Sequence, residues 1–201
     1  MKRIRVQTDS VKKGEIMRKY TWLLVVFMVC LGSTYLMSAT PATAASAAEI
    51  ERGVNSALKN LYHKYPAARA LAKDAKGILV FPDILKGGFI VGGLFGEGAL
   101  RKDSATVAYY NTVAASYGYQ AGLQKYSYAL IFMTESSLRY LDKSDGWEIG
   151  VGPSIVVVDA GMAKSLTTTT AKADIYAFFF SQKGLMAGLG LQGTKITRIR
   201  K

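Results

Sequence analysis

A glycine-punctuated apolar run is the feature that most constrains how this chain folds. Residues 77–100 read GILVFPDILKGGFIVGGLFGEGAL, and residues 183–193 echo the pattern as KGLMAGLGLQG. The β-branched and aromatic residues favour strands, and glycine within a strand marks a bulge, a bend or the close approach of another backbone. None of these glycines carries a side chain that could do chemistry. The runs therefore predict a scaffold of bent strands.

The first 47 residues have the organisation of a secretory signal. The basic segment that starts at Met17 precedes an apolar stretch that starts at Trp22, and this stretch is shorter than the roughly 20 apolar residues of a membrane span. Two small-x-small sites end at Ala44 and Ala47, so we expect cleavage after one of them, with Met1 or Met17 as the true start. We therefore expect an exported protein of the periplasm or cell envelope.

Cleavage after residue 47 would leave a basic chain without cysteine. Residues 48–201 contain 19 Lys and Arg and 12 Asp and Glu, a formal charge of 19 − 12 = +7. The single cysteine, Cys30, lies in the signal segment, so the mature chain is expected to have neither a disulfide nor a thiol nucleophile. A chain of this length can bury the core of one domain. Its positive charge suits an anionic membrane surface or simple solubility, and export makes nucleic acid the least favoured partner.

Two helices are predicted at the start of residues 48–201. Apolar residues recur at helical spacing from Ile50 to Tyr65, which indicates one amphipathic helix. Pro66 favours the first turn of a second helix over residues 66–76, which Gly77 ends. We therefore expect the helices within residues 48–76 and a strand-rich segment over residues 77–201.

After Gly77 the apolar period changes from helical to extended. Separate strands are predicted at residues 78–81, 88–93, 98–102, 105–110, 116–124, 128–133, 147–159, 174–181, 185–192 and 195–199. Thr134 can cap one inserted short helix that runs to Leu141, and Pro153 requires an edge position or a bulge. This order of elements predicts an α+β fold, with two N-terminal helices packed on a strongly curved, mostly antiparallel, glycine-rich sheet or partial barrel.

The residue types that common catalytic and metal sites need are absent or scattered. His63 is the only histidine, so the usual zinc and copper ligand sets cannot form, and we expect no metal and no cofactor. The chain has no GxSxG or phosphate-loop motif. We therefore expect no catalytic residue and no enzyme. A hydrolase that pairs two distant carboxylates, such as Asp83 and Glu97, is the remote alternative.

Basic residues cluster in the helical segment. Arg69, Lys73 and Lys76 recur at i, i+4 and i+7 on the second helix. Together with their neighbours in sequence they make up the candidate lipid-binding residues Lys59, Lys64, Arg69, Lys73, Lys76 and Lys86. Such a face suits an anionic membrane, where each Lys or Arg near the headgroups contributes about 1 kcal/mol. A solvated helix face whose apolar side packs on the sheet explains the same pattern.

Several motifs, in order, resemble the SYLF domain, also called the Ysc84 actin-binding domain. The motifs are AKGILVFP at residues 75–82, KGGFIVGG at 86–93, GEG at 96–98, YQAG at 119–122 and SQKGLMAGLGLQG at 181–193. The resemblance spans residues 67–199 and implies a non-catalytic lipid-binding module. Eukaryotic members bind phosphoinositides through a basic, amphipathic N-terminal region, fungal members also bind actin, and exported bacterial members are associated with membrane lipids. That region corresponds here to the helices of residues 48–76.

Export and resemblance together predict the function. We expect a module that associates peripherally with anionic phospholipid headgroups at the cell envelope, with neither actin nor nucleic acid as a partner. The alternative is a periplasmic structural or protein-interaction module, in which tyrosine-rich strands or a free sheet edge engage a partner without direct lipid binding.

Overall fold

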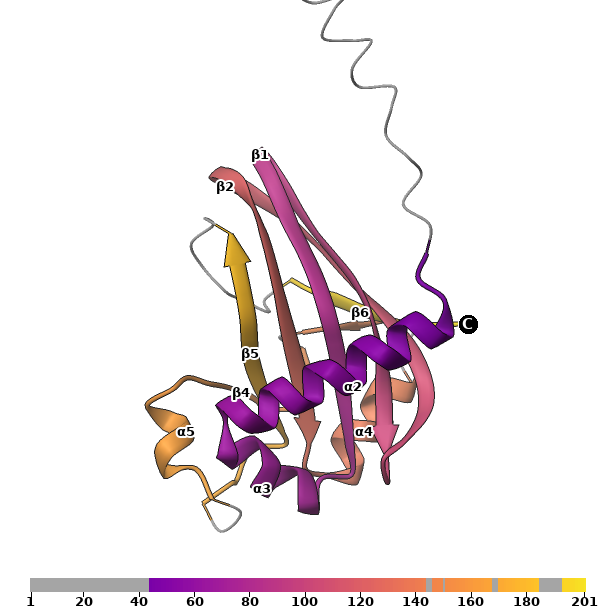
Figure 1. Ribbon diagram of the computed structural model, residues 1–201, viewed down its shortest axis with the longest axis vertical. Helices are drawn as coiled ribbons and strands as arrows, with labels where there is room; N and C mark the ends of the chain where they lie inside the picture. Colours follow the sequence, from indigo (N-terminus) through magenta and orange to yellow (C-terminus); the bar gives the residue numbers. More distant parts are fainter. Residues whose placement is uncertain (1–43, 144–145, 150, 168–169, 185–192) are drawn as a thin grey trace, which may run out of the picture. The chain divides into compact units, whose positions relative to one another are not determined.

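The structure of this chain is a computed structural model that describes residues 44–143, 146–149, 151–167, 170–184 and 193–201. The predicted signal segment up to residue 43 and the predicted strand at residues 185–192 lie outside the described residues. Ala45–Lys201 form one compact unit. Figure 1 shows its elements, which in chain order are α2 (Ala47–Lys64), α3 (Pro66–Asp74), β1 (Gly77–Lys102), β2 (Ala105–Phe132), α4 (Glu135–Lys143), β3 (Trp147–Glu148), β4 (Ile155–Val158), α5 (Met162–Ser165), β5 (Ile175–Gly184) and β6 (Lys195–Ile199).

The two predicted N-terminal helices are present. A capping box begins α2, because the Ser46 hydroxyl accepts from the Glu49 N–H at 3.3 Å and the Glu49 carboxylate accepts from the Ser46 N–H at 2.7 Å. Tyr65 breaks the helix in an extended conformation, and Pro66 then starts α3. The second helix ends at Asp74, two residues earlier than predicted, because Ala75 is already extended and leads into β1.

Two long strands form a ribbon that replaces six of the predicted strands. β1 and β2 are each one continuous strand, and they pair from Gly77 opposite Phe132 to Lys102 opposite Ala105. The register shifts at bulges along the ribbon, but neither strand ends there. The prediction of separate strands over residues 78–133 is therefore wrong, since the glycines interrupt the apolar pattern but not the backbone pairing. Proline is tolerated at a bulge, and Pro82 lies where the register shifts between Phe81 and Ile84.

β2 is the central strand of the sheet. One edge of β2 pairs with β1, and the other edge pairs with β6 near its start and with β5 near its end. The six strands run in the order β3-β6-β2-β5-β4 with β1 on the free side of β2, and only β4 and β5 are parallel.

The ribbon bends about halfway along, so the sheet has two arms (Figure 1). Arm A holds β4, β5 and residues 77–88 and 122–132, and arm B holds β3, β6 and residues 92–116. The curved, mostly antiparallel sheet of the prediction is confirmed.

Two glycines of β1 let its two arms touch. A Cβ atom at Gly98 would collide with the carbonyl oxygen of Val80 and would lie 2.8 Å from Phe81 Cδ1. A Cβ atom at Gly96 would collide with the side chain of Ile84 and would lie 2.8 Å from the carbonyl oxygen of Asp83. Backbone from one arm therefore packs directly on backbone from the other, which only glycine permits at these positions.

Hydrophobic clusters occupy both faces of arm A. The cluster between the two arms includes Phe81, Tyr110, Tyr128, Phe132, Leu138 of α4 and Trp147. The cluster between arm A and the helices includes Val54 and Leu61 of α2, Leu71 of α3, Val80, Ile131 and Phe178. The Tyr128 hydroxyl donates to Thr112 at 2.9 Å, so the polar end of this buried ring is satisfied while burial raises its pKa.

The segment between α4 and β5 differs from its prediction. Thr134 caps α4 as expected, because its hydroxyl accepts from the Ser137 N–H at 3.3 Å. The strand predicted over residues 147–159 is reduced to the short β3 and β4. Pro153 lies between them in a bend, where its missing N–H interrupts no ladder.

Substitution of Gly98 tests the contact between the arms. We expect Gly98→Ala to lower the free energy of unfolding by about 1–3 kcal/mol, since the added methyl group must push apart two packed backbones. Gly93→Ala is the matched control, because its Cβ atom would approach nothing closer than the Ala114 carbonyl oxygen at 3.8 Å. Urea denaturation measures the free energy of unfolding of both variants. An equal stability of the two variants would contradict the contact.

The attachment of α2 to arm B predicts a pH dependence. Glu51 of α2 accepts from Arg101 at 2.7 Å and from the Tyr109 hydroxyl at 3.0 Å. A hydrogen bond with Thr106, followed by those of Tyr109 and Arg101, lowers the pKa of Glu51 below its ordinary value of 4.5. The ionised form is thus favoured in the folded chain, so this stabilisation is present above pH 4.5 and is lost as the pH falls through the lowered pKa.

We expect Glu51→Gln to cost about 1 kcal/mol of unfolding free energy at neutral pH, since the ion pair is partly exposed. The difference from the unaltered chain should shrink as the pH falls below 4.5. Thermal unfolding of both proteins, followed from about pH 3 to about pH 7, checks this, because the range includes pH values below and above the ordinary pKa of a glutamate. Glu148→Gln, at an exposed position of β3, is the control. An equal pH response of the two variants would contradict the stabilising role of ionised Glu51.

Candidate functional site

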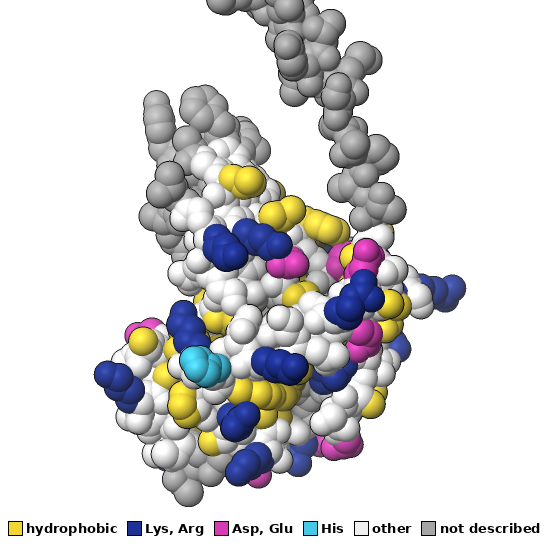
Figure 2. All heavy atoms as spheres, viewed as in Figure 1, with side chains coloured by type: hydrophobic (Ala, Val, Ile, Leu, Met, Phe, Trp, Pro, Cys, Tyr) yellow, Lys and Arg dark blue, Asp and Glu magenta, His cyan; other side chains and the backbone are white. Residues whose placement is uncertain are grey.

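Five of the six predicted basic residues are exposed along α2, α3 and the bend that follows α3. Lys76, which was predicted on the second helix, lies beyond the end of that helix, because the chain is already extended at Ala75. We call Lys59, Lys64, Arg69, Lys73 and Lys76 the basic helical face; all five are exposed, and none forms an ion pair with another described residue. Residues 59–76 contain these five cations and one acidic residue, Asp74, which gives a formal charge of 5 − 1 = +4. Figure 2 shows Lys and Arg side chains spread over the face that these helices cover.

The aromatic neighbours of two cations hold them close to the helices. The ammonium of Lys64 lies 5.2 Å from the centre of the Tyr65 ring, and the guanidinium of Arg69 lies 5.9 Å from the centre of the Tyr62 ring. Cation–π contacts at exposed sites are weak, so both cations remain able to bind an anion.

The apolar side of both helices is used within the fold. Ile50, Val54 and Leu61 of α2 and Leu71 of α3 are buried against arm A. These helices therefore present charge to their surroundings and have no apolar stripe left for a membrane. The two interpretations of the sequence pattern are thereby combined, since the helix packs on the sheet and its polar face carries the unpaired cations.

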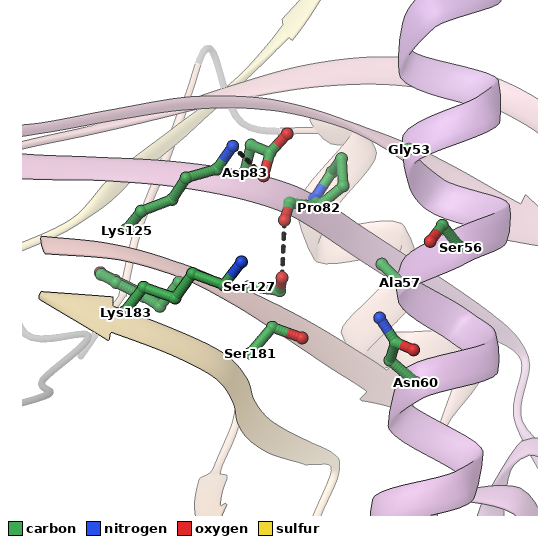
Figure 3. Close-up of a pocket in the computed structure, with 11 residues that line it drawn as sticks. Gly53, Ser56, Ala57, Asn60, Pro82, Asp83, Lys125, Ser127, Ser181 and Lys183 are labelled. Carbon is green, nitrogen blue, oxygen red and sulfur yellow. Dashed lines mark hydrogen bonds and ion pairs between the residues drawn. The ribbon is translucent and has the colours of Figure 1, made fainter.

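A polar pocket of about 200 Å³ lies between α2 and the sheet (Figure 3). Its lining comes from α2, from the bulge of β1, and from the facing parts of β2 and β5, and includes Ser56, Asn60, Asp83, Lys125, Ser127, Ser181 and Lys183. The Ser127 hydroxyl donates to the Pro82 carbonyl oxygen at 2.6 Å, and Lys125 forms an ion pair with Asp83 at 2.8 Å. We call this site the α2–sheet pocket.

A bulge in β5 brings two lysines together at this pocket. Lys125 pairs with Lys183, whereas Ser127 pairs with Phe180, so β5 has one extra residue in this interval. Ser181 adopts φ 54° there, which is uncommon for a residue other than glycine. Like charges directly opposite each other on a sheet are destabilising, and only Lys125 has an acidic partner among the described residues. Lys183 therefore supplies an unpaired cation to the pocket.

A second hollow joins the pocket to the basic helical face. This hollow, of about 660 Å³, is lined by Asn60, His63, Lys64, Phe180, Ser181 and Gln182. Asn60 and Ser181 belong to both linings. A polar surface with three lysines, Lys64, Lys125 and Lys183, thus follows the C-terminal half of α2 and the end of β5.

Lys86 lies apart from the other predicted residues. Its neighbour Leu85 pairs with Lys125, which lines the α2–sheet pocket, and successive residues of a strand point to opposite faces. Lys86 is therefore turned away from the face that α2 covers. Lys125 and Lys183, in contrast, were missed by sequence reasoning, because only the register and the bulge place them opposite each other.

The acidic and metal-ligating side chains of the described residues are dispersed. These residues contain no group of three or more His, Cys, Asp and Glu side chains that could hold a metal ion. Asp83 is the one carboxylate that lines the α2–sheet pocket, and the described lining of that pocket has no second acid for a glycosidase pair. In this part of the chain, no helix has the length and hydrophobicity needed to cross a membrane.

The comparison with protein families confirms the resemblance found in the sequence. Residues 113–201 match the family model Ysc84, described as "Las17-binding protein actin regulator". The matched residues include Lys125 and Lys183 and run from β2 to β6, while α2, α3, β1 and the motifs at residues 75–98 precede them. No curated protein matches the chain. The printed description thus speaks of Las17 binding and actin regulation by members of that family.

Proposed function

We propose that this chain, whose residues 113–201 match the Ysc84 family model, binds anionic lipid surfaces peripherally through its basic helical face. The observation that carries the proposal is the group of five exposed cations on α2, on α3 and in the bend after α3, without an ion pair to any described residue. A lipid surface of negative charge supplies the missing partners, at about 1 kcal/mol for each Lys or Arg near the headgroups.

The α2–sheet pocket extends this surface toward single headgroups. Lys183 has no acidic partner among the described residues, and Ser56, Asn60 and Ser181 offer hydrogen-bond donors beside it. A lipid phosphate group that projects from the bilayer surface could bind the Lys183 ammonium and these neutral hydrogen-bond donors. The proposed contact is therefore a flat basic face with one polar hollow at its border.

The proposed location is the cell envelope, reached by export. This part of the proposal rests on the signal-like sequence of residues 1–47, most of which lie outside the described residues. Fractionation of the producing cells, followed by sequencing of the N-terminus of the recovered protein, tests both the location and the cleavage after Ala44 or Ala47. Recovery of the uncut chain from the cytoplasm would remove this part of the proposal.

Neutralising part of the basic helical face should weaken binding to vesicles. We expect Arg69→Gln, Lys73→Gln and Lys76→Gln together to lower the affinity for phosphatidylglycerol vesicles by about 100-fold at low salt, from about 1 kcal/mol per lost cation. The difference should shrink at about 0.5 M salt, where screening acts within a few ångströms. Co-sedimentation with the vesicles measures the affinity.

The matched control removes the same charge elsewhere. Arg139, Lys143 and Lys172 are exposed and lie outside α2 and α3, so their combined change to Gln should leave vesicle binding within about threefold. Equal losses from the two triple variants would show that net charge alone governs binding and that the basic helical face is not the site.

The family description names Las17 binding and actin regulation, and binding to actin filaments is the second candidate function. The same sedimentation assay, with filaments in place of vesicles, separates the two. A chain that sediments with filaments and leaves phosphatidylglycerol vesicles unbound would overturn the lipid proposal in favour of a protein-interaction module.

A further inference from the structure

Four large apolar side chains are exposed where the β1–β2 ribbon bends. Leu85 is 51% exposed, Phe95 49%, Val113 38% and Leu123 68%. We call these four residues the bend patch. Leu85 and Phe95 lie on β1 and Val113 and Leu123 on β2, on either side of the bend.

All four side chains lie on the face of the sheet that α2 covers. Leu85 pairs directly with Lys125, which lines the α2–sheet pocket, and Leu123 is two residues from Lys125 on the same strand. Phe95 is two residues from Glu97, whose carboxylate accepts from the N–H of Ala45 next to α2, and Phe95 pairs with Val113. The bend patch therefore continues the surface of α2 toward the bend.

The two pairs are close to each other because the arms of β1 touch. Gly96 packs on Ile84 and on the carbonyl oxygen of Asp83. Phe95 precedes Gly96 and Leu85 follows Ile84, so both side chains lie next to this contact between the arms. Figure 2 shows hydrophobic side chains grouped beside Lys or Arg side chains in the upper part of this face. Lys125 and Lys183, at the α2–sheet pocket, are the cations that adjoin Leu85 and Leu123 by register.

We propose that the bend patch inserts into the hydrocarbon border of an anionic bilayer while Lys125 and Lys183 bind the headgroups. This inference rests on the proposed function and names the element that enters the membrane. The helices have buried their own apolar residues, so an apolar contribution to lipid binding has to come from another element. Apolar side chains bordered by lysines suit the interface, where the lysine stems lie along the acyl boundary and the ammonium groups reach the phosphates.

Charge favours a bilayer over a second copy of this chain. A two-fold dimer through the bend patch would bring two identical surfaces together, each with Lys125, Lys183 and the nearby basic helical face. Like charges facing across an interface oppose such an association, whereas anionic headgroups neutralise them.

Depth measurement on bound vesicles tests the insertion. A spin label is attached to Leu123→Cys in the full chain that also carries Cys30→Ser, and its accessibility to oxygen and to a water-soluble nickel chelate is compared with and without phosphatidylglycerol vesicles. We expect accessibility to the chelate to fall and accessibility to oxygen to rise. A label at Val157→Cys, which is 47% exposed on β4, should remain accessible to the chelate.

Binding by side-chain variants gives a second readout. Leu85→Ser with Leu123→Ser should lower vesicle affinity about tenfold or more, by a loss that high salt leaves unchanged. Val151→Ser with Val157→Ser is the control, since both valines are exposed outside the bend patch and their loss should leave affinity unaltered. Circular dichroism confirms that each variant is folded, and labelling at the exposed position 123 does not depend on the serine variants.

The outcomes separate this inference from the proposed function. If the chain binds vesicles, the label at position 123 stays in water and the serine variants bind normally, the insertion is overturned and peripheral binding by the basic helical face stands. If the unaltered chain leaves the vesicles unbound, both fail. If sedimentation shows a dimer that the Leu85→Ser and Leu123→Ser changes dissociate, the occupant of the bend patch is a second copy and the bilayer is excluded.

Discussion

The contact between the two arms of β1 is the constraint on which the rest of the structure depends. Gly96 and Gly98 of one arm lie against Ile84, Asp83 and Val80 of the other, and each position lacks room for a Cβ atom. The contact folds the ribbon back on itself, so that arm A and arm B enclose the cluster around Tyr110, Tyr128 and Trp147. A small sheet thereby acquires an interior without a second sheet from elsewhere in the chain.

The helix α2 bridges both arms and keeps the fold-back closed. At its start, Glu51 binds Arg101 and Tyr109 of arm B, while Leu61 and Tyr65 at its end are buried with Phe178 of arm A. This placement commits the apolar side of the helix to the core and leaves its lysines outside. Charge and apolar surface, which an interfacial helix would combine in one element, are therefore divided here between the helices and the bend of the ribbon.

Local signals in the sequence predicted the helices well and the strands only in part. Pro66 and Thr134 act within a few residues of themselves, so their effects on helix starts can be seen in the chain. The cap of α2 at Ser46 was found only in the structure. The glycines at residues 87–98 predicted the curvature of the sheet correctly. Their pattern is the same whether the chain turns at each glycine or continues through it, so the prediction divided β1 into separate strands. The exposed positions of Arg69 and Lys73 follow from helical spacing, whereas Lys76 lies beyond the end of α3. Lys125 and Lys183 were not predictable, because 58 residues separate them (183 − 125) and a bulge sets their register.

The turn between β1 and β2 sets the order in which such a sheet can assemble. Asp103 and Ser104 both adopt positive φ, 46° and 67°, as a tight two-residue hairpin turn requires. Pairing can spread outward from this turn, and the separation of partners grows from 105 − 102 = 3 residues to 132 − 77 = 55 with each step closing only a short additional loop. β5, β6 and α2 join through contacts much more distant in sequence. We therefore expect the long ribbon to form first in folding and to serve as the template on which the other elements assemble.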